Sequence, residues 1–238
     1  MKKKKAKQVK NKVRIKKNPE KKEKKIKKIS VFNKYNKEKK EVLVIVAHPD
    51  DETIWMGGTL LEIKAKQNSN VTLICLCRKN DKDRYPKFQK ACEALGVKGY
   101  IFDLDDGEDS GVYKNISLQD IINKISPITN NKLYTTLYTH NENGEYGHPR
   151  HIETHYAVLE MLSRGLILAE EIYFFSYKKM KNKYQGYAIY NSSADKLIKL
   201  KKPYLKMKKR IIQEIYGYKK GGFEEKSCKE IEAFDLRQ

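Results

Sequence analysis

The residues best suited to chemistry in this 238-residue chain follow an apolar run that starts at residue 42. Residues 42–58 read VLVIVAHPDDETIWMGG, so His48, Asp50 and Asp51 come directly after six apolar residues. Adjacent carboxylates repel each other and are costly to remove from water, so a hydrophobic core gives no reason to place them there. A bound cation would offset that repulsion and would use the nearby imidazole. The cluster therefore indicates a metal site.

A second polar cluster, THNENGEYGHPRHIETH, occupies residues 139–155. It contains His148, His151 and His155, in a chain that has only five histidines. A catalytic zinc ion usually takes three protein ligands and leaves one position open, and His48 with Asp51 supplies only two. We therefore expect the second cluster to complete the site.

Alternating strand-like and helix-like segments must position these two clusters. Apolar runs of strand length lie at 42–47, 71–77, 99–104, 133–139 and 171–176. Helical periodicity is found at 54–67, 85–95, 117–126 and 152–164, with a further helix at 203–217 and an irregular connection at 178–195. This order predicts an α/β, Rossmann-like fold, with a mainly parallel sheet and helices on both faces. Ligands bind such sheets beyond the carboxyl ends of the strands, so both clusters should share one crevice.

The net charge of +21 is concentrated at the start of the chain. Residues 1–40 hold 20 Lys or Arg and three Glu, whereas the other 198 residues hold 31 basic and 27 acidic residues. We expect 1–40 to be a lysine-rich tail, disordered in isolation, and 41–238 to be the folded domain. Two interpretations of the tail stay open: a solvated low-complexity extension, or an electrostatic attachment to an anionic membrane surface or nucleic acid.

Hydropathy and cysteine usage favour a cytoplasmic protein. No apolar run approaches the roughly 20 residues of a membrane span, and none has the form of a secretory signal peptide. The four cysteines show no CxxC pairing and fall in or near predicted core elements, which favours buried thiols over disulfides. Peripheral association with a membrane through the tail is a further hypothesis.

Two motifs together resemble those of the PIG-L/LmbE family of zinc-dependent deacetylases. AHPDDE at 47–52 is followed by GG at 57–58, and GEYGHPRH stands at 144–151, about a hundred residues later. The resemblance extends from about Val42 into the C-terminal third. It implies a Rossmann-like fold, a zinc ion (or another divalent metal such as Fe²⁺) and removal of acyl groups from N-acylated amino sugars and related amides.

Carried over position by position, the resemblance implies the metal ligands His48, Asp51 and His151. Asp50 matches the family's general base, which takes a proton from the attacking water. Two adjacent aspartates would then have different tasks, because one holds the metal while the other moves a proton.

Four further positions match groups that contact the substrate in the family. His148 matches a histidine that acts near the scissile carbonyl, as electrophile or as acid to the leaving amine. Tyr146 matches a tyrosine that can turn towards the developing oxyanion. Arg84 and Asp109 match substrate-binding residues, the second within EDSG at 108–111.

Two positions depart from the family pattern. The second motif of the family commonly reads HPDH, and Arg150 stands at the position of its aspartate. A cation therefore replaces a carboxylate beside a metal ligand. Lys87 replaces the glutamate of an Arg-x-x-Glu segment. Both departures concern the substrate site and the support of the ligand, and not the metal ligands themselves. Glu52 has two interpretations, as the residue that orients a ligand histidine or as an ordinary glutamate at a helix start.

The resulting hypothesis is a zinc-dependent hydrolase that removes an acetyl or other acyl group from the amide nitrogen of an N-acetylated amino sugar or glycoconjugate. One alternative is a metal-dependent amidase of a non-sugar metabolite. Another is an inactive, basic scaffold or nucleic-acid-binding protein. Nucleic acid is the less favoured partner, because 41–238 is nearly neutral and carries no aromatic-and-basic RNA-binding motif. The oligomeric state is not indicated by the sequence.

Overall fold

The computed structural model describes residues 39–106, 114–130, 132–180 and 186–237. The predicted tail lies outside these residues except for Lys39 and Lys40, and so does the predicted substrate contact Asp109. None of the helices within the described ranges is long and apolar enough to cross a membrane.

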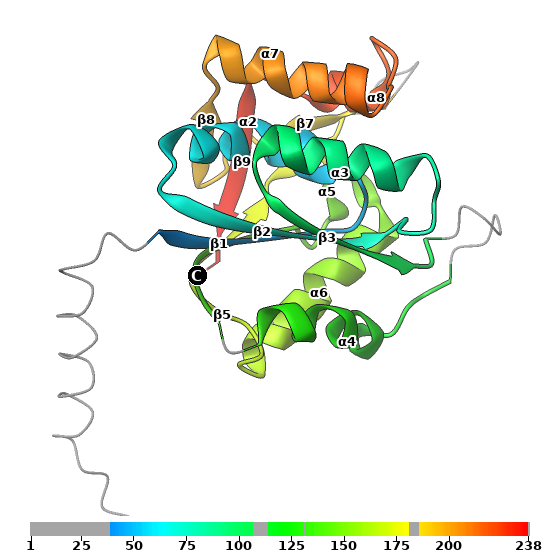
Figure 1. Ribbon diagram of the computed structural model, residues 1–238, viewed down its shortest axis with the longest axis vertical. Coiled ribbons are helices and arrows are strands. Elements are labelled where there is room, and N and C mark those ends of the chain that lie inside the picture. Colours follow the sequence, from blue (N-terminus) through cyan, green and yellow to red (C-terminus); the bar gives the residue numbers. More distant parts are fainter. Residues whose placement is uncertain (1–38, 107–113, 131, 181–185, 238) are drawn as a thin grey trace, which may run out of the picture. The chain divides into compact units, whose positions relative to one another are not determined.

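A seven-stranded mixed sheet lies at the centre of the described residues (Figure 1). Its strand order is β3-β2-β1-β4-β5-β9-β8. The strands are β1 (Lys40–Val46), β2 (Ser69–Cys77), β3 (Lys98–Leu104), β4 (Leu133–Thr139), β5 (Leu168–Phe175), β8 (Lys196–Lys199) and β9 (Ile231–Leu236). The first five are parallel, whereas β9 runs antiparallel to β5 and β8. The predicted mainly parallel α/β sheet is confirmed.

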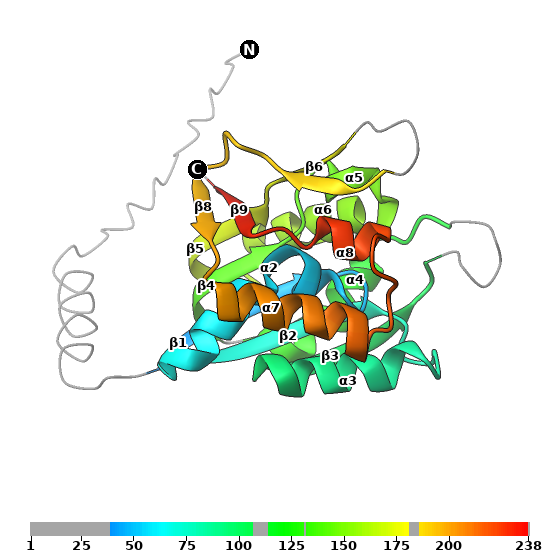
Figure 2. The same cartoon turned by 90° about the horizontal axis from the view of Figure 1, so that it is seen from above.

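Helices cover both faces of the sheet (Figures 1 and 2). One face carries α2 (Asp51–Lys66), α3 (Arg84–Leu95), α7 (Lys202–Arg210), which continues as the π-helix η1 (Ile211–Ile215), and the short α8 (Phe223–Ser227). The other face carries α4 (Leu118–Thr129) and α6 (Pro149–Ser163), and a single turn, α5 (Gly144–Gly147), precedes α6.

The side chains of the central strand β1 contribute to two apolar clusters, one on each face of the sheet. Residues 42–47 are all buried. Because side chains alternate across a strand, Val42, Val44 and Val46 join the apolar cluster beneath α2 and α3, whereas Leu43 and Ile45 join the cluster beneath α4 and α6. The near-continuous apolar run of the sequence therefore reflects burial on both faces.

The C-terminal third contains more strand than the sequence predicted. The prediction of an irregular connection at 178–195 is wrong in part, because β6 (Tyr177–Lys179) and β7 (Ala188–Tyr190) form a two-stranded sheet there. The prediction also lacked β8 and β9. These strands are short and their local sequence pattern is weak. They form because each pairs with a strand from elsewhere in the chain. The four cysteines are buried and free, as expected.

Candidate active site

The two polar clusters meet at the carboxyl ends of β1 and β4. These strands are neighbours, with Ile45 opposite Thr139. Just beyond, the N–H of Ala47 donates to Nε2 of His140 at 2.9 Å. This hydrogen bond joins residues 93 positions apart. It lies at the edge of the sheet where the sequence analysis predicted a crevice shared by both clusters.

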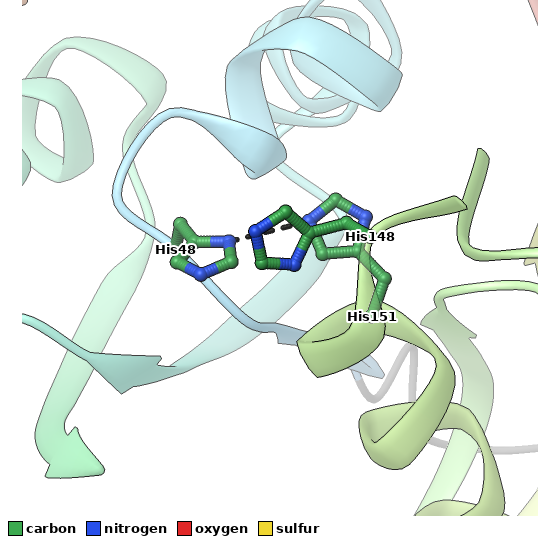
Figure 3. A group of neighbouring side chains, drawn as sticks. All are labelled: His48, His148 and His151. Atoms are coloured by element: carbon green, nitrogen blue, oxygen red, sulfur yellow. Dashed lines mark hydrogen bonds between the residues drawn. The ribbon is translucent and has the colours of Figure 1, made fainter. Parts of the chain in front are cut away.

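The three predicted ligands bring one donor atom each to a common point. Nδ1 of His48 lies 3.2 Å from Nε2 of His151. Oδ2 of Asp51 lies 3.5 Å from that Nδ1 and 3.4 Å from that Nε2. A tetrahedral ion bound at about 2.0–2.2 Å holds such atoms roughly 3.3–3.6 Å apart. The donors therefore fit a divalent ion with almost no movement. Figure 3 shows His48, on the loop after β1, facing His151 at the start of α6.

A buried carboxylate, Glu145, supports this centre and is not among the residues predicted from the sequence. Its Oε2 lies 2.5 Å from Nδ1 of His151 and 2.8 Å from Nδ1 of His140. Burial opposes its ionisation, but the two imidazoles lower the pKa of Glu145 to about 2. An anion at Nδ1 of His151 keeps the proton on that nitrogen and leaves Nε2 for a metal.

His140 lies close to the centre without offering it a ligand. Its Nδ1 contacts Glu145 and its Nε2 accepts the N–H of Ala47. Both ring nitrogens are therefore occupied. The next histidine outward, His155, contacts the carbonyl oxygen of His140 through Nδ1 at 2.9 Å. His140 therefore supports the centre from behind, whereas His155 contacts the backbone of His140.

His148 is placed as a hydrogen-bond donor to the substrate. Its Nδ1 accepts the N–H of Arg150 at 3.2 Å and so caps α6. Burial, followed by the neighbouring His48 and His151, lowers the pKa of His148 to about 3, so the ring is neutral at pH 7. Because Nδ1 accepts, the ring proton is assigned to Nε2. The side chain thus presents an N–H group, which suits the predicted electrophile and does not suit a metal ligand.

The backbone of Asp50 is strained and is held by Glu52. Asp50 has a φ of 121°, which residues other than glycine rarely adopt. Its N–H donates to Oε2 of Glu52 at 3.1 Å, and Oε1 of Glu52 accepts the Tyr216 hydroxyl at 2.8 Å. None of the hydrogen bonds of Glu52 within the described residues goes to a histidine. Its role is therefore to fix the turn at Asp50, and the histidine-orienting carboxylate is Glu145.

The side chain of Asp50 faces a tyrosine and an arginine. Its Oδ2 accepts a hydrogen bond from Tyr218 and lies 3.7 Å from the guanidinium of Arg84. Arg84 also donates to the Tyr218 hydroxyl and lies over that ring, 4.9 Å from its centroid. Burial and then Asp51 raise the pKa of Asp50 well above its usual range, although Tyr218 and Arg84 oppose this. The carboxylate is more basic than usual, as a group that takes a proton from water should be.

The centre opens into a cavity of about 140 Å³. Its lining includes six of the eight predicted site residues: His48, Asp50, Asp51, Arg84, Tyr146 and His148. The ring of Tyr146 lies 5.3 Å from that of His151 and 4.8 Å from that of Phe223. Burial, followed by Asp51 and Asp50, raises the pKa of Tyr146, so its hydroxyl is a protonated donor.

The two departures from the family pattern lie away from this cavity. Arg150 is fully buried and donates to Glu153 and to the carbonyl oxygens of Asp105 and Lys114. It ties α6 to the ends of the segment between β3 and α4. Lys87, on α3, pairs with Asp83, which immediately precedes that helix, with Nζ 2.7 Å from the carboxylate. Neither residue is part of the cavity lining.

Residues 43–162 match the protein family described as PIG-L: GlcNAc-PI de-N-acetylase. The chain belongs to the PIG-L family. The resemblance expected from the two motifs is confirmed. The matched residues include both clusters and end before Tyr218 and Phe223, which also line the cavity.

Relatives share part of this sequence, and solved structures share its fold. The 1D-myo-inositol 2-acetamido-2-deoxy-alpha-D-glucopyranoside deacetylase of Thermobifida fusca is 24% identical over 157 residues, which are 52% of this chain and 54% of that protein. This chain spans about half the length of the curated relatives it matches. The N,N'-diacetylchitobiose deacetylase from Pyrococcus horikoshii has a TM-score of 0.62 at 17% identity, covering 94% of each chain. The zinc inhibited form of teicoplanin deacetylase has a TM-score of 0.52 at 15% identity, covering 74% of this chain and 84% of that one. These likenesses confirm the Rossmann-like fold.

Proposed function

We propose that this PIG-L family member is a metal-dependent hydrolase that removes an acetyl or other acyl group from the nitrogen of an N-acylated amino sugar or glycoconjugate. The observation that carries the proposal is the convergence of His48, Asp51 and His151 beside Asp50, at the base of a cavity. The family description and the deacetylase relatives support it. The names of those deacetylases refer to N-acetylated sugars, which favours sugar amides over other metabolites as substrates.

The proposed ligands fit more than one metal. Two imidazole nitrogens and one carboxylate oxygen suit zinc, and they also suit Fe²⁺. A bound divalent ion would supply Lewis-acid chemistry, activating water and stabilising negative charge on the amide oxygen. We propose zinc, with Fe²⁺ as the alternative. The zinc inhibited form of a structural neighbour is a reason to test both.

The other side chains would divide the proton transfers and the charge stabilisation. Asp50 takes a proton from the attacking water and returns it to the departing amine. The Nε2–H of His148 and the hydroxyl of Tyr146 donate hydrogen bonds to the developing oxyanion. Arg84 orients Asp50 and the substrate near it. Asp109 remains a proposed sugar contact.

The test is an activity assay on the full chain after metal removal. Protein depleted by a chelator is reloaded with Zn²⁺ or Fe²⁺, and acetate release is followed from N-acetylated amino sugars, from their glycosides and from a non-sugar N-acetyl amide. We expect activity to disappear on depletion and to return with at least one metal. The variant His151→Ala should lose both metal and activity, whereas His155→Gln, which changes a histidine outside the ligand set, should keep its metal.

Three outcomes would contradict the proposal. Hydrolysis of a non-sugar amide in place of every sugar would favour the amidase alternative. Absence of both bound metal and hydrolysis would favour the inactive scaffold. Full metal affinity in His151→Ala would show that the ligand assignment is wrong.

A further inference from the structure

Part of the cavity wall comes from beyond the residues that match the family. Tyr218, Phe223 and Glu224 line the cavity, and the last two begin α8. The ring of Phe223 packs edge-on against that of Tyr146, at 4.8 Å between centroids. This contact fixes α8 against a proposed oxyanion donor. The first turn of α8 thus faces the place where the substrate would react.

Glu224 supplies this wall with a carboxylate that has no hydrogen-bond or ion-pair partner among the residues that the structure describes. The side chain is half-buried, and within the described residues it makes no hydrogen bond or ion pair. The next residue, Glu225, differs: its carboxylate pairs with Nζ of Lys209 at 2.9 Å and accepts the N–H of Gly221 at 3.2 Å. A half-buried carboxylate without donors costs free energy unless a ligand provides them.

The cations in the same wall already have anionic partners. Nε of Arg78 lies 2.6 Å from Asp106, and Arg84 lies 3.7 Å from Asp50. A phosphate or carboxylate on a substrate would meet guanidinium groups that are already paired, and the carboxylate of Glu224, which has no partner among the described residues. A hydroxyl group would meet an acceptor. The charge distribution therefore favours a neutral ligand rich in hydroxyl groups.

We propose that Glu224 determines substrate specificity: its carboxylate accepts hydrogen bonds from hydroxyl groups of a neutral N-acylated amino sugar and disfavours substrates that carry a phosphate. The inference rests on the proposed function and narrows its substrate class. A site built to bind a hydroxyl group discriminates strongly, because its own polar group is left unpaired by the wrong ligand. Like charges brought together add to that discrimination.

The experiment compares the metal-loaded full chain with Glu224→Gln and Glu224→Asp. Glu225→Gln is the matched control, since it changes a neighbouring charge on the same helix. The substrates are N-acetylglucosamine and its 1- and 6-phosphates, and kcat/KM is measured for each by acetate release. The wild type should prefer the neutral sugar. In Glu224→Gln that preference over at least one phosphate should fall about tenfold, mainly through KM. Glu224→Asp, which keeps the charge, and Glu225→Gln should retain it.

The possible failures are distinguishable. An unchanged preference in Glu224→Gln, or an equal change in Glu225→Gln, would overturn the role of Glu224 and leave the proposed function standing. If the wild type prefers a phosphorylated sugar, the role of Glu224 is likewise overturned and the proposed function still stands. Absence of acetate release from all three sugars and from their glycosides would overturn the proposed function, and this inference with it.

Discussion

Asp50 and Asp51 are adjacent in the chain but have different partners. Asp51 accepts the N–H of His48 at 2.8 Å and the indole N–H of Trp55 at 2.9 Å. Burial opposes its ionisation, yet His151 and then His140 hold the pKa of Asp51 well below its usual range. The pKa of Asp50 is instead raised, by burial and by Asp51. One carboxylate is thus kept as an anion that can hold a metal, and the other is suited to move a proton.

Asp50→Asn tests this division. The amide keeps the shape of the side chain and its contact with Tyr218, but it cannot take a proton from water. We expect turnover to fall by roughly 100-fold or more while metal content stays unchanged. Metal content is measured by atomic emission and turnover by acetate release. Loss of metal together with turnover would mean that the roles of the two aspartates are exchanged.

Glu145→Gln tests the support behind His151. The substituted amide has no charge and only one oxygen with which to meet two imidazoles and the N–H of Asn141. We expect metal affinity to fall roughly 10- to 100-fold, measured by competition with a chromophoric chelator. Glu142→Gln changes an exposed carboxylate three residues away and is the matched control. Equal affinities in both variants would contradict the supporting role.

The residues of the site divide into those that the sequence revealed and those that it did not. The two polar clusters could be predicted because charged and imidazole groups after buried strands have no structural explanation, and the family resemblance then implied His48, Asp51 and His151 as the ligands. Glu145 stands inside the second motif, but nothing in a sequence distinguishes a buried carboxylate from an exposed one. Tyr218 lies 168 positions after Asp50, and only folding brings them together.

The helix α2, which carries Asp51, is interrupted at Met56 and then continues. Met56 in α2 has a φ of −145° and a ψ of 17°, outside the helical range. Just past this break, the N–H groups of Gly58 and Thr59 donate to the carboxylate of Glu232, each at 2.8 Å. Nζ of Lys208 reaches the same carboxylate at 2.7 Å. Glu232 from β9 thus caps the second half of α2, where an anion is favourable.

Glu232→Gln should destabilise the whole domain. Glu232 and Lys208 are both fully buried, so removing one charge leaves the other without compensation. We expect the free energy of unfolding to fall by about 3–5 kcal/mol, measured by denaturant titration. The control is Glu214→Gln, which breaks an exposed ion pair between Glu214 and Arg210. This variant should leave the unfolding transition unchanged. Similar stabilities for both variants would show that the buried pair does not hold α2.

Elements with a strong local pattern could be predicted, and those fixed by distant contacts could not. The first five strands and their helices repeat a buried run followed by helical periodicity, and each was found within a few residues of its predicted bounds. The strand β9 has no such pattern of its own. It pairs with β5 and β8 and brings Glu232 to α2. At the GG pair another part of the chain comes close to α2, since a Cβ on Gly58 would lie 2.3 Å from the side chain of Leu200.

At the scale of the whole molecule, charge and chemistry occupy different parts of the sequence. The proposed metal centre and the family match lie within 43–162, and C-terminal residues complete the cavity. The excess positive charge belongs to residues 1–40, with 20 Lys or Arg against three Glu. Nothing in the proposed reaction requires that charge. We therefore propose that this charge serves to locate the protein and does not take part in catalysis.

We predict that residues 1–40 attract the protein to an anionic membrane surface. Each lysine near an anionic bilayer contributes about 1 kcal/mol, so even partial engagement of the tail would suffice for binding. The full chain should co-sediment with vesicles that contain anionic lipid and not with neutral vesicles. Binding should weaken as salt is raised, because the Debye length is already only about 8 Å at physiological ionic strength.

The control is a full-length variant in which the Lys and Arg of residues 1–38 are changed to Ser. This variant should stay in solution when vesicles are sedimented, yet it should release acetate from a soluble sugar at the same rate as the wild type. Equal binding to neutral and anionic vesicles would contradict the electrostatic attraction. Since lysine runs also release counterions from nucleic acid, co-sedimentation with RNA but not with anionic vesicles would assign the tail to that polyanion instead.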